Sequence, residues 1–95
     1  RSARRVLLPG VGEASSAMHY LQSRNLDQLL ISLRQPVLGI CLGMQLMCSF
    51  SEENSTNCLG IFSEKVRLFE TPTLKVPQIG WNSVATCNSH NALWC

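Results

Sequence analysis

Hydrophobic residues in the first half of the chain occur in short continuous runs that alternate with helical spacing. The continuous runs at residues 6–8 and 37–40 predict two buried strands, because a strand covered on both faces is apolar throughout. Between them, the i, i+3, i+4, i+7 spacing of an amphipathic helix occurs twice, over residues 14–21 and 26–33. A third helix is predicted over residues 43–50. This order of strands and helices favours a βαβ unit in a parallel sheet.

Polar and turn-forming residues separate the predicted elements. Asn25 is a typical N-cap for the second helix, with Gln28 three residues later as in a capping box. Residues 51–57 are polar and predict a loop. Residues 61–69 and 76–84 are apolar enough for strands, but prolines and a glycine interrupt them, so we expect irregular strands there.

Length and composition exclude several classes of protein. The 95 residues make at most one small domain, and 45% hydrophobic with 15% charged residues is not the composition of a collagen, a coiled coil or a disordered tail. The net charge of +2 is too small to predict a nucleic-acid partner. The apolar run at residues 36–50 is shorter than the roughly 20 residues of a membrane span. Five cysteines without a CxxC motif indicate reduced thiols in a cytoplasmic protein.

The segment Gly-Ile-Cys-Leu-Gly at residues 39–43 carries the candidate chemistry. A nucleophile at a sharp strand-to-helix turn is held in a strained backbone conformation and projects above the sheet. Such a turn brings the residues two before and two after the nucleophile close together, and here they are Gly39 and Gly43. We therefore predict a reactive thiol at Cys41, with a buried structural cysteine as the alternative. Gln45 lies on the same helical face, where it either contacts a substrate or is an ordinary surface residue.

A second glycine loop, Pro-Gly-Val-Gly at residues 9–12, ends the first predicted strand. Both loops are expected to meet at the C-terminal edge of the sheet, where open α/β sheets bind ligands. The backbone N–H of Leu42, together with that of Val11 or Gly12, would then form an oxyanion hole.

These residues together resemble the class I, triad-type glutamine amidotransferases, and more narrowly the glutaminase subunits of imidazole glycerol phosphate synthases. The likeness rests on residues 8–12, residues 39–45 and the segment Lys-Val-Pro-Gln-Ile-Gly-Trp-Asn at residues 75–82. It covers residues 6–84. The resemblance implies an α/β fold that is part of a flavodoxin-like, doubly wound and mostly parallel sheet with flanking helices.

The resemblance also implies an activity. Cys41 would attack the side-chain amide of glutamine and form a thioester, which water hydrolyses to glutamate. Gly10 and Gln45 would hold the glutamine, and the loop at Val11 and Gly12 would supply an oxyanion N–H after a backbone shift. No cofactor and no metal are implied.

A partner is implied as well: a (β/α)₈-barrel cyclase subunit that receives the ammonia in histidine biosynthesis. Trp81 and Asn82 would lie towards it, although packing of Trp81 within its own domain is equally compatible with the sequence. The family's first strand and its His-Pro-Glu motif have no counterpart here, and neither His19 nor His90 matches the catalytic histidine. We therefore expect residues 1–95 to be an internal fragment of one amidotransferase domain, inactive on its own.

Other interpretations of the sequence remain open. The chain is also compatible with the glutaminase domain of another triad amidotransferase, or with a non-catalytic docking module of the same fold. Cys87, His90 and Cys95, with Cys58, offer soft metal ligands. Because the paired CxxC motifs of most zinc sites are missing, we predict no metal site.

Overall fold

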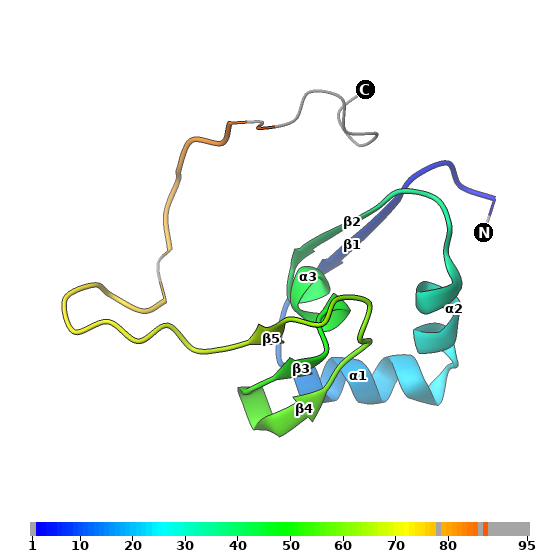
Figure 1. Cartoon of the computed structure of the whole chain (residues 1–95), viewed down its shortest axis with the longest axis horizontal. Coiled ribbons are helices and arrows are strands. Elements are labelled where there is room, and N and C mark those ends of the chain that lie inside the picture. Colours follow the sequence, from blue (N-terminus) through cyan, green and yellow to red (C-terminus); the bar gives the residue numbers. More distant parts are fainter. Residues whose placement is uncertain (1, 78, 86, 88–95) are drawn as a thin grey trace.

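Two short parallel strands, β1 (Val6–Gly10) and β2 (Val37–Cys41), lie at the centre of the fold. The computed structural model describes residues 2–77, 79–85 and 87. Parallel strands require a crossover connection, and here two helices make it (Figure 1). The register places Gly10 opposite Cys41, so the carboxyl ends of the two strands meet at one edge. The predicted βαβ order is confirmed.

Three helices follow the predicted pattern, with different ends. The crossover consists of α1 (Ala14–Ser23) and α2 (Leu26–Ser32), and β2 runs directly into α3 (Leu42–Met47). The third helix ends three residues earlier than predicted. After it the backbone is extended, and Ser49 donates its N–H to the carbonyl of Glu64 at 2.9 Å, so strand pairing replaces the last helical turn.

The segment predicted to be a polar loop, residues 51–57, is a turn whose two ends belong to the strands of a second small sheet. Its strands β3 (Phe50–Ser51), β4 (Thr56–Asn57) and β5 (Lys65–Val66) stand in the order β4-β3-β5. A 3₁₀ turn, η1 (Glu53–Ser55), joins the first two. The loop prediction was wrong at the two ends of the segment, where Ser51 pairs with Thr56 in strands. Two hydroxyls of the segment are buried in hydrogen bonds of the turn. Thr56 donates to the carbonyl of Glu53 at 2.8 Å, and Ser51 accepts from the Glu53 N–H at 3.2 Å.

The hydrophobic core lies between α1, α3 and the segment after β4. Its buried members are Ala14, Met18, Leu42, Leu46 and Leu59. The prediction of two fully buried strands was wrong, since Leu7 of β1 is 63% exposed and Ile40 of β2 is 46% exposed. The described residues form only two strands here, and α3 packs against them, so the side chains that point away from the helix remain accessible.

Asn25 ends α1 rather than capping α2. Its backbone is left-handed, with φ 55° and ψ 23°, and its side chain makes no capping hydrogen bond, which corrects the predicted capping box. Its N–H donates instead to the carbonyl of Gln22 at 3.2 Å. Asparagine tolerates this conformation better than most residues, which suits it to the junction between the two helices.

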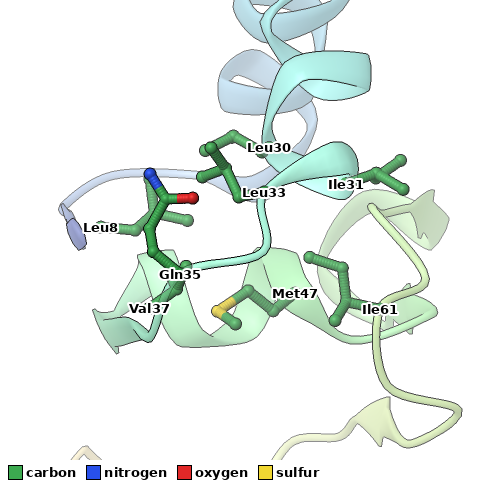
Figure 2. Close-up of a pocket in the computed structure, with 8 residues that line it drawn as sticks. All are labelled: Leu8, Leu30, Ile31, Leu33, Gln35, Val37, Met47 and Ile61. Atoms are coloured by element: carbon green, nitrogen blue, oxygen red, sulfur yellow. The ribbon is translucent and has the colours of Figure 1, made fainter. Parts of the chain in front are cut away.

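A small apolar pocket of about 130 Å³ lies among α2, α3 and the strands (Figure 2). Gln35 contributes the one polar side chain of its lining; the others are Leu8, Leu30, Ile31, Leu33, Val37, Met47 and Ile61. None of the residues predicted to act in catalysis lines it.

The chain after β5 runs away from the body as an extended segment (Figure 1). The strand predicted over residues 61–69 is reduced to Lys65–Val66, and the described part of residues 76–84 contains no strand. Several large apolar side chains of this segment are exposed, including Phe69, Ile79 and Trp81. Among the described residues, no helix has the length and apolar character needed to cross a membrane.

Candidate active site

Cys41 occupies the strained turn between β2 and α3. Its backbone has φ 54° and ψ −120°, a positive-φ conformation that costs a residue with a side chain about 1–3 kcal/mol. The residue is exposed, and its side chain makes no capping hydrogen bond to α3. The backbone of Cys41 therefore has the geometry of a nucleophile elbow, which exposes the side chain at the end of a strand.

The glycines around this turn allow its backbone to touch the neighbouring elements. A Cβ atom on Gly43 would overlap the carbonyl oxygen of Leu8 in β1 and lie 2.7 Å from its carbonyl carbon. A Cβ on Gly39 would lie 2.8 Å from the Cα of Met44, and one on Gly10 would lie 3.0 Å from the Gly43 nitrogen. Gly39 and Gly43 therefore exclude larger side chains and Gly10 leaves little room for one, because α3 packs directly against both strands.

The two predicted glycine loops lie side by side, as the pairing of Gly10 with Cys41 requires. Leu42 is the first residue of α3, so its N–H has no partner in the helical ladder and lies beside the thiol. Across the strand pair, Val11 is 93% exposed and Gly12 has φ +114°, a conformation that favours glycine. These are the backbone groups from which an oxyanion hole would be assembled.

A larger hollow of about 890 Å³ opens beside α3. Gln45 forms part of its wall, and Glu52 and Glu53 contribute carboxylates. Residues 66–70 of the extended segment close another side, where Arg67 pairs with Glu52 at 3.8 Å. Cys41 is not part of the lining, although it precedes Gln45 by one helical turn. The hollow thus carries carboxylates and a guanidinium, next to the face that bears Gln45.

Glu13 is a residue that the sequence interpretation missed. It follows Gly12 and caps α1: its carboxylate accepts hydrogen bonds from the N–H groups of Ser15 at 2.8 Å and Ser16 at 3.1 Å. Both serine hydroxyls and the side-chain amide of Asn54 also donate to it. The signal in the sequence was an acidic residue just before a helix, followed by two serines. Aspartate, rather than glutamate, is the usual carboxylate at such a position.

These hydrogen bonds make stability dependent on pH. Those from Ser15, with further ones from Asn54 and Ser16, lower the pKa of Glu13 from its ordinary value of 4.5 to about 2. The folded protein keeps the carboxylate ionised where the unfolded chain takes up a proton. The stabilisation is therefore fully present above pH 4.5 and lost as the pH falls towards 2.

We expect the melting temperature of the complete protein to exceed that of a Glu13→Gln variant above pH 4.5, and the difference to shrink as the pH approaches 2. Thermal unfolding of both proteins across this range measures the effect. Glu70→Gln, the same substitution at an exposed position of the extended segment, is the control. A difference between wild type and Glu13→Gln that stays constant with pH would contradict the assignment.

The remaining thiols differ from Cys41 in their surroundings. Burial, and to a lesser extent the neighbouring Cys48, raise the pKa of Cys58 above its ordinary value of 9.0. Cys48, seven residues after Cys41, is only partly buried. Cys87 is exposed, whereas His90 and Cys95, the other candidate metal ligands, lie outside the described residues.

The residues predicted to face a partner lie on the extended segment. Trp81 is fully exposed and Asn82 is exposed beside it. Trp81 therefore makes no close packing with the other described residues.

Comparison with known proteins agrees with this arrangement. The family profile for class-I glutamine amidotransferases matches residues 2–93, nearly the whole chain. The chain therefore belongs to the class-I glutamine amidotransferase family, whose α/β fold accounts for the parallel strands and the helices that join them.

Within the family, the similar proteins found are subunits named HisH of imidazole glycerol phosphate synthase. The chain is 50% identical over 91 residues to the subunit of Bacteroides thetaiotaomicron, covering 94% of this chain and 46% of that protein. It is 49% identical over 90 residues to the subunit of Blochmanniella floridana, with coverage of 94% and 46%. The Haemophilus influenzae subunit is 50% identical over 84 residues, with coverage of 88% and 42%. The chain thus spans somewhat less than half the length of these relatives.

Proposed function

We propose that the chain is part of the glutaminase subunit of an imidazole glycerol phosphate synthase, and that the complete subunit hydrolyses glutamine to glutamate and ammonia. The observation that carries the proposal is the conformation of Cys41, an exposed thiol on a positive-φ turn between a strand and a helix. Identity of about 50% to subunits of that synthase supports the choice among amidotransferases.

The proposed reaction begins when the thiolate of Cys41 attacks the side-chain amide carbon of glutamine. The carbonyl oxygen becomes an oxyanion, which the N–H of Leu42 and an N–H of the loop at Val11 and Gly12 stabilise. Each such donor is worth about 10²–10³ in rate. The amide nitrogen takes a proton and leaves as ammonia, and the sulfur is left in a thioester with the glutamyl group. Water then attacks the thioester, which releases glutamate and restores the thiol.

Binding of glutamine is assigned to the surroundings of the elbow. Gly10 lets the backbone of the first loop approach the turn closely. The side chain of Gln45 lies on the wall of the large hollow, one helical turn from the thiol, where its amide can pair with the polar end of an amino acid. Exclusion of water from this space would favour release of ammonia towards a partner rather than into solvent.

The partner is proposed to be a (β/α)₈-barrel cyclase subunit that consumes the ammonia in histidine biosynthesis. The exposed Trp81, with Asn82 beside it, supports a contact surface on the extended segment, because exposed aromatic residues are common in interface hot spots.

A cytoplasmic location is proposed as well, supported by the free state of the four described cysteines. The general base is proposed to come from a part of the protein other than these residues, since His19 lies exposed on α1.

Labelling with a glutamine-like chloroketone tests the assignment of the nucleophile. We expect Cys41 of the complete protein to be alkylated first, and Cys58 slowly, because burial raises its pKa and lowers its thiolate fraction. Excess glutamine should protect Cys41 and leave the other thiols unchanged. Peptide mapping by mass spectrometry gives the rate at each cysteine.

A small neutral alkylating agent provides the control, since it reports accessibility without recognition of glutamine. With that agent, the exposed Cys87 should react alongside Cys41. Equal labelling of all thiols by the chloroketone, with no protection by glutamine, would favour a docking module over an enzyme.

A further inference from the structure

We propose that Glu13 is a positioning residue for the oxyanion loop, and that its hydrogen bond to Asn54 ties this loop to the η1 turn on the rim of the substrate hollow. The inference rests on the proposed function, because a residue can position the oxyanion loop only if that loop acts in glutamine hydrolysis. Glu13 itself is proposed to touch neither the substrate nor the thiol.

Glu13 is fixed in place by both its main chain and its side chain. Its carbonyl accepts the first helical hydrogen bond of α1, from Ala17 at 3.2 Å, and its carboxylate caps the N–H groups of Ser15 and Ser16. The residue before it, Gly12, is the last glycine of the oxyanion loop. The loop therefore ends at a residue that cannot shift without breaking the cap of a ten-residue helix.

The carboxylate of Glu13 also reaches across to a segment far away in the sequence. The side-chain amide of Asn54 donates to Glu13 Oε1 at 2.8 Å. A second hydrogen bond joins the same two segments: the N–H of Ala14 donates to the carboxylate of Glu53 at 2.7 Å. Ala14 is completely buried, so the junction of α1 with η1 is packed as well as hydrogen-bonded.

This junction connects the two parts of the site that must act together. On one side lies the loop whose N–H is to receive the oxyanion. On the other side lie Glu52 and Glu53, which line the hollow next to Gln45. Because Asn54 follows Glu53 directly, the bridge fixes the loop relative to the wall of the substrate space. Displacement of a catalytic group by about 1 Å can cost on the order of 10²-fold in rate. Loss of the bridge should therefore lower the rate of the chemical step rather than weaken substrate binding.

The test uses the complete protein with its synthase partner and compares kcat and KM for glutamine. Asn54→Gly removes the amide without a backbone penalty, because Asn54 has φ 53° and glycine accepts that conformation. Asn25→Gly is the matched control: the same substitution at φ 55°, at a side chain with no capping hydrogen bond and away from the site. Glu13→Ala removes the bridge and the cap, and Glu13→Gln restores an acceptor of the same length.

We expect Asn54→Gly and Glu13→Ala to lower kcat by about 10- to 100-fold with KM nearly unchanged, Glu13→Gln to recover part of the loss, and Asn25→Gly to behave as wild type. Melting temperatures measured in parallel separate an effect on kcat from an effect on stability. If Glu13→Ala does not fold, the kcat of Asn54→Gly alone tests the inference. Wild-type kcat in Asn54→Gly, with or without a lower melting temperature, overturns the inference while leaving the proposed function intact. Full activity of Cys41→Ala in the same series would overturn both.

Discussion

Replacement of Cys41 by alanine is expected to abolish glutamine hydrolysis. Removal of the nucleophile of a catalytic triad costs on the order of 10⁶-fold in turnover, because no other group can form the covalent intermediate. The loss should appear in kcat, measured as glutamate released by the complete protein. Binding of glutamine should survive, since Gly10 and Gln45 are unchanged.

Cys48→Ala is the matched control for this experiment. Cys48 lies seven residues further along the chain, and its sulfur makes only a weak contact, 3.8 Å from the carbonyl oxygen of Met44. We expect it to retain glutaminase activity close to that of wild type. If Cys41→Ala keeps substantial activity while Cys48→Ala loses it, the nucleophile has been assigned to the wrong sulfur.

Gly43→Ala should be the most destabilising small substitution near the elbow. Alanine is favoured over glycine within a helix by about 1 kcal/mol. That gain is outweighed here, because the new methyl group would overlap the carbonyl oxygen of Leu8 and force α3 away from β1. Overpacking against a backbone atom that cannot move costs about 3 kcal/mol or more. Denaturant unfolding of the complete protein should show this net loss, and the shift of α3 should lower activity as well.

Gly60→Ala is the control that separates the cost of steric overlap from the cost of replacing a glycine. Gly60 has φ +72°, so alanine is strained there by about 1–2 kcal/mol, but a Cβ at this position has no heavy atom within 4 Å. We therefore expect Gly60→Ala to cost less than Gly43→Ala and to leave glutaminase activity intact. A Gly43→Ala protein as stable as Gly60→Ala would mean that α3 does not pack against β1 as described.

The elements around the elbow were predictable because their constraints are local. Two apolar runs, two amphipathic stretches and the glycines at positions 39 and 43 placed β1, α1, α2, β2 and the start of α3. At the elbow, the close approach of the backbone requires glycine, so the two glycines in the sequence predict the turn directly.

The features that the sequence did not predict depend on contacts between distant segments. The polar residues of β3 and β4 pair as strands, and the hydroxyls of Ser51 and Thr56 are buried in hydrogen bonds to the backbone of Glu53, which no hydrophobic period reveals. Glu13 acquires its role only when Asn54, 41 positions away, folds back onto α1. Leu7 and Ile40 are accessible because burial depends on which elements flank the strands, not on the strands themselves.

If Cys41 is the nucleophile, its sulfur becomes bonded to the amide carbon of the glutamine side chain during each turnover. Rapid acid quenching of the complete protein during turnover, followed by peptide mapping, detects this bond. We expect a γ-glutamyl group on the peptide that contains Cys41, present with glutamine and absent without it. Steady hydrolysis of glutamine with an unmodified Cys41 at every quench time, or with the adduct on another residue, would contradict it.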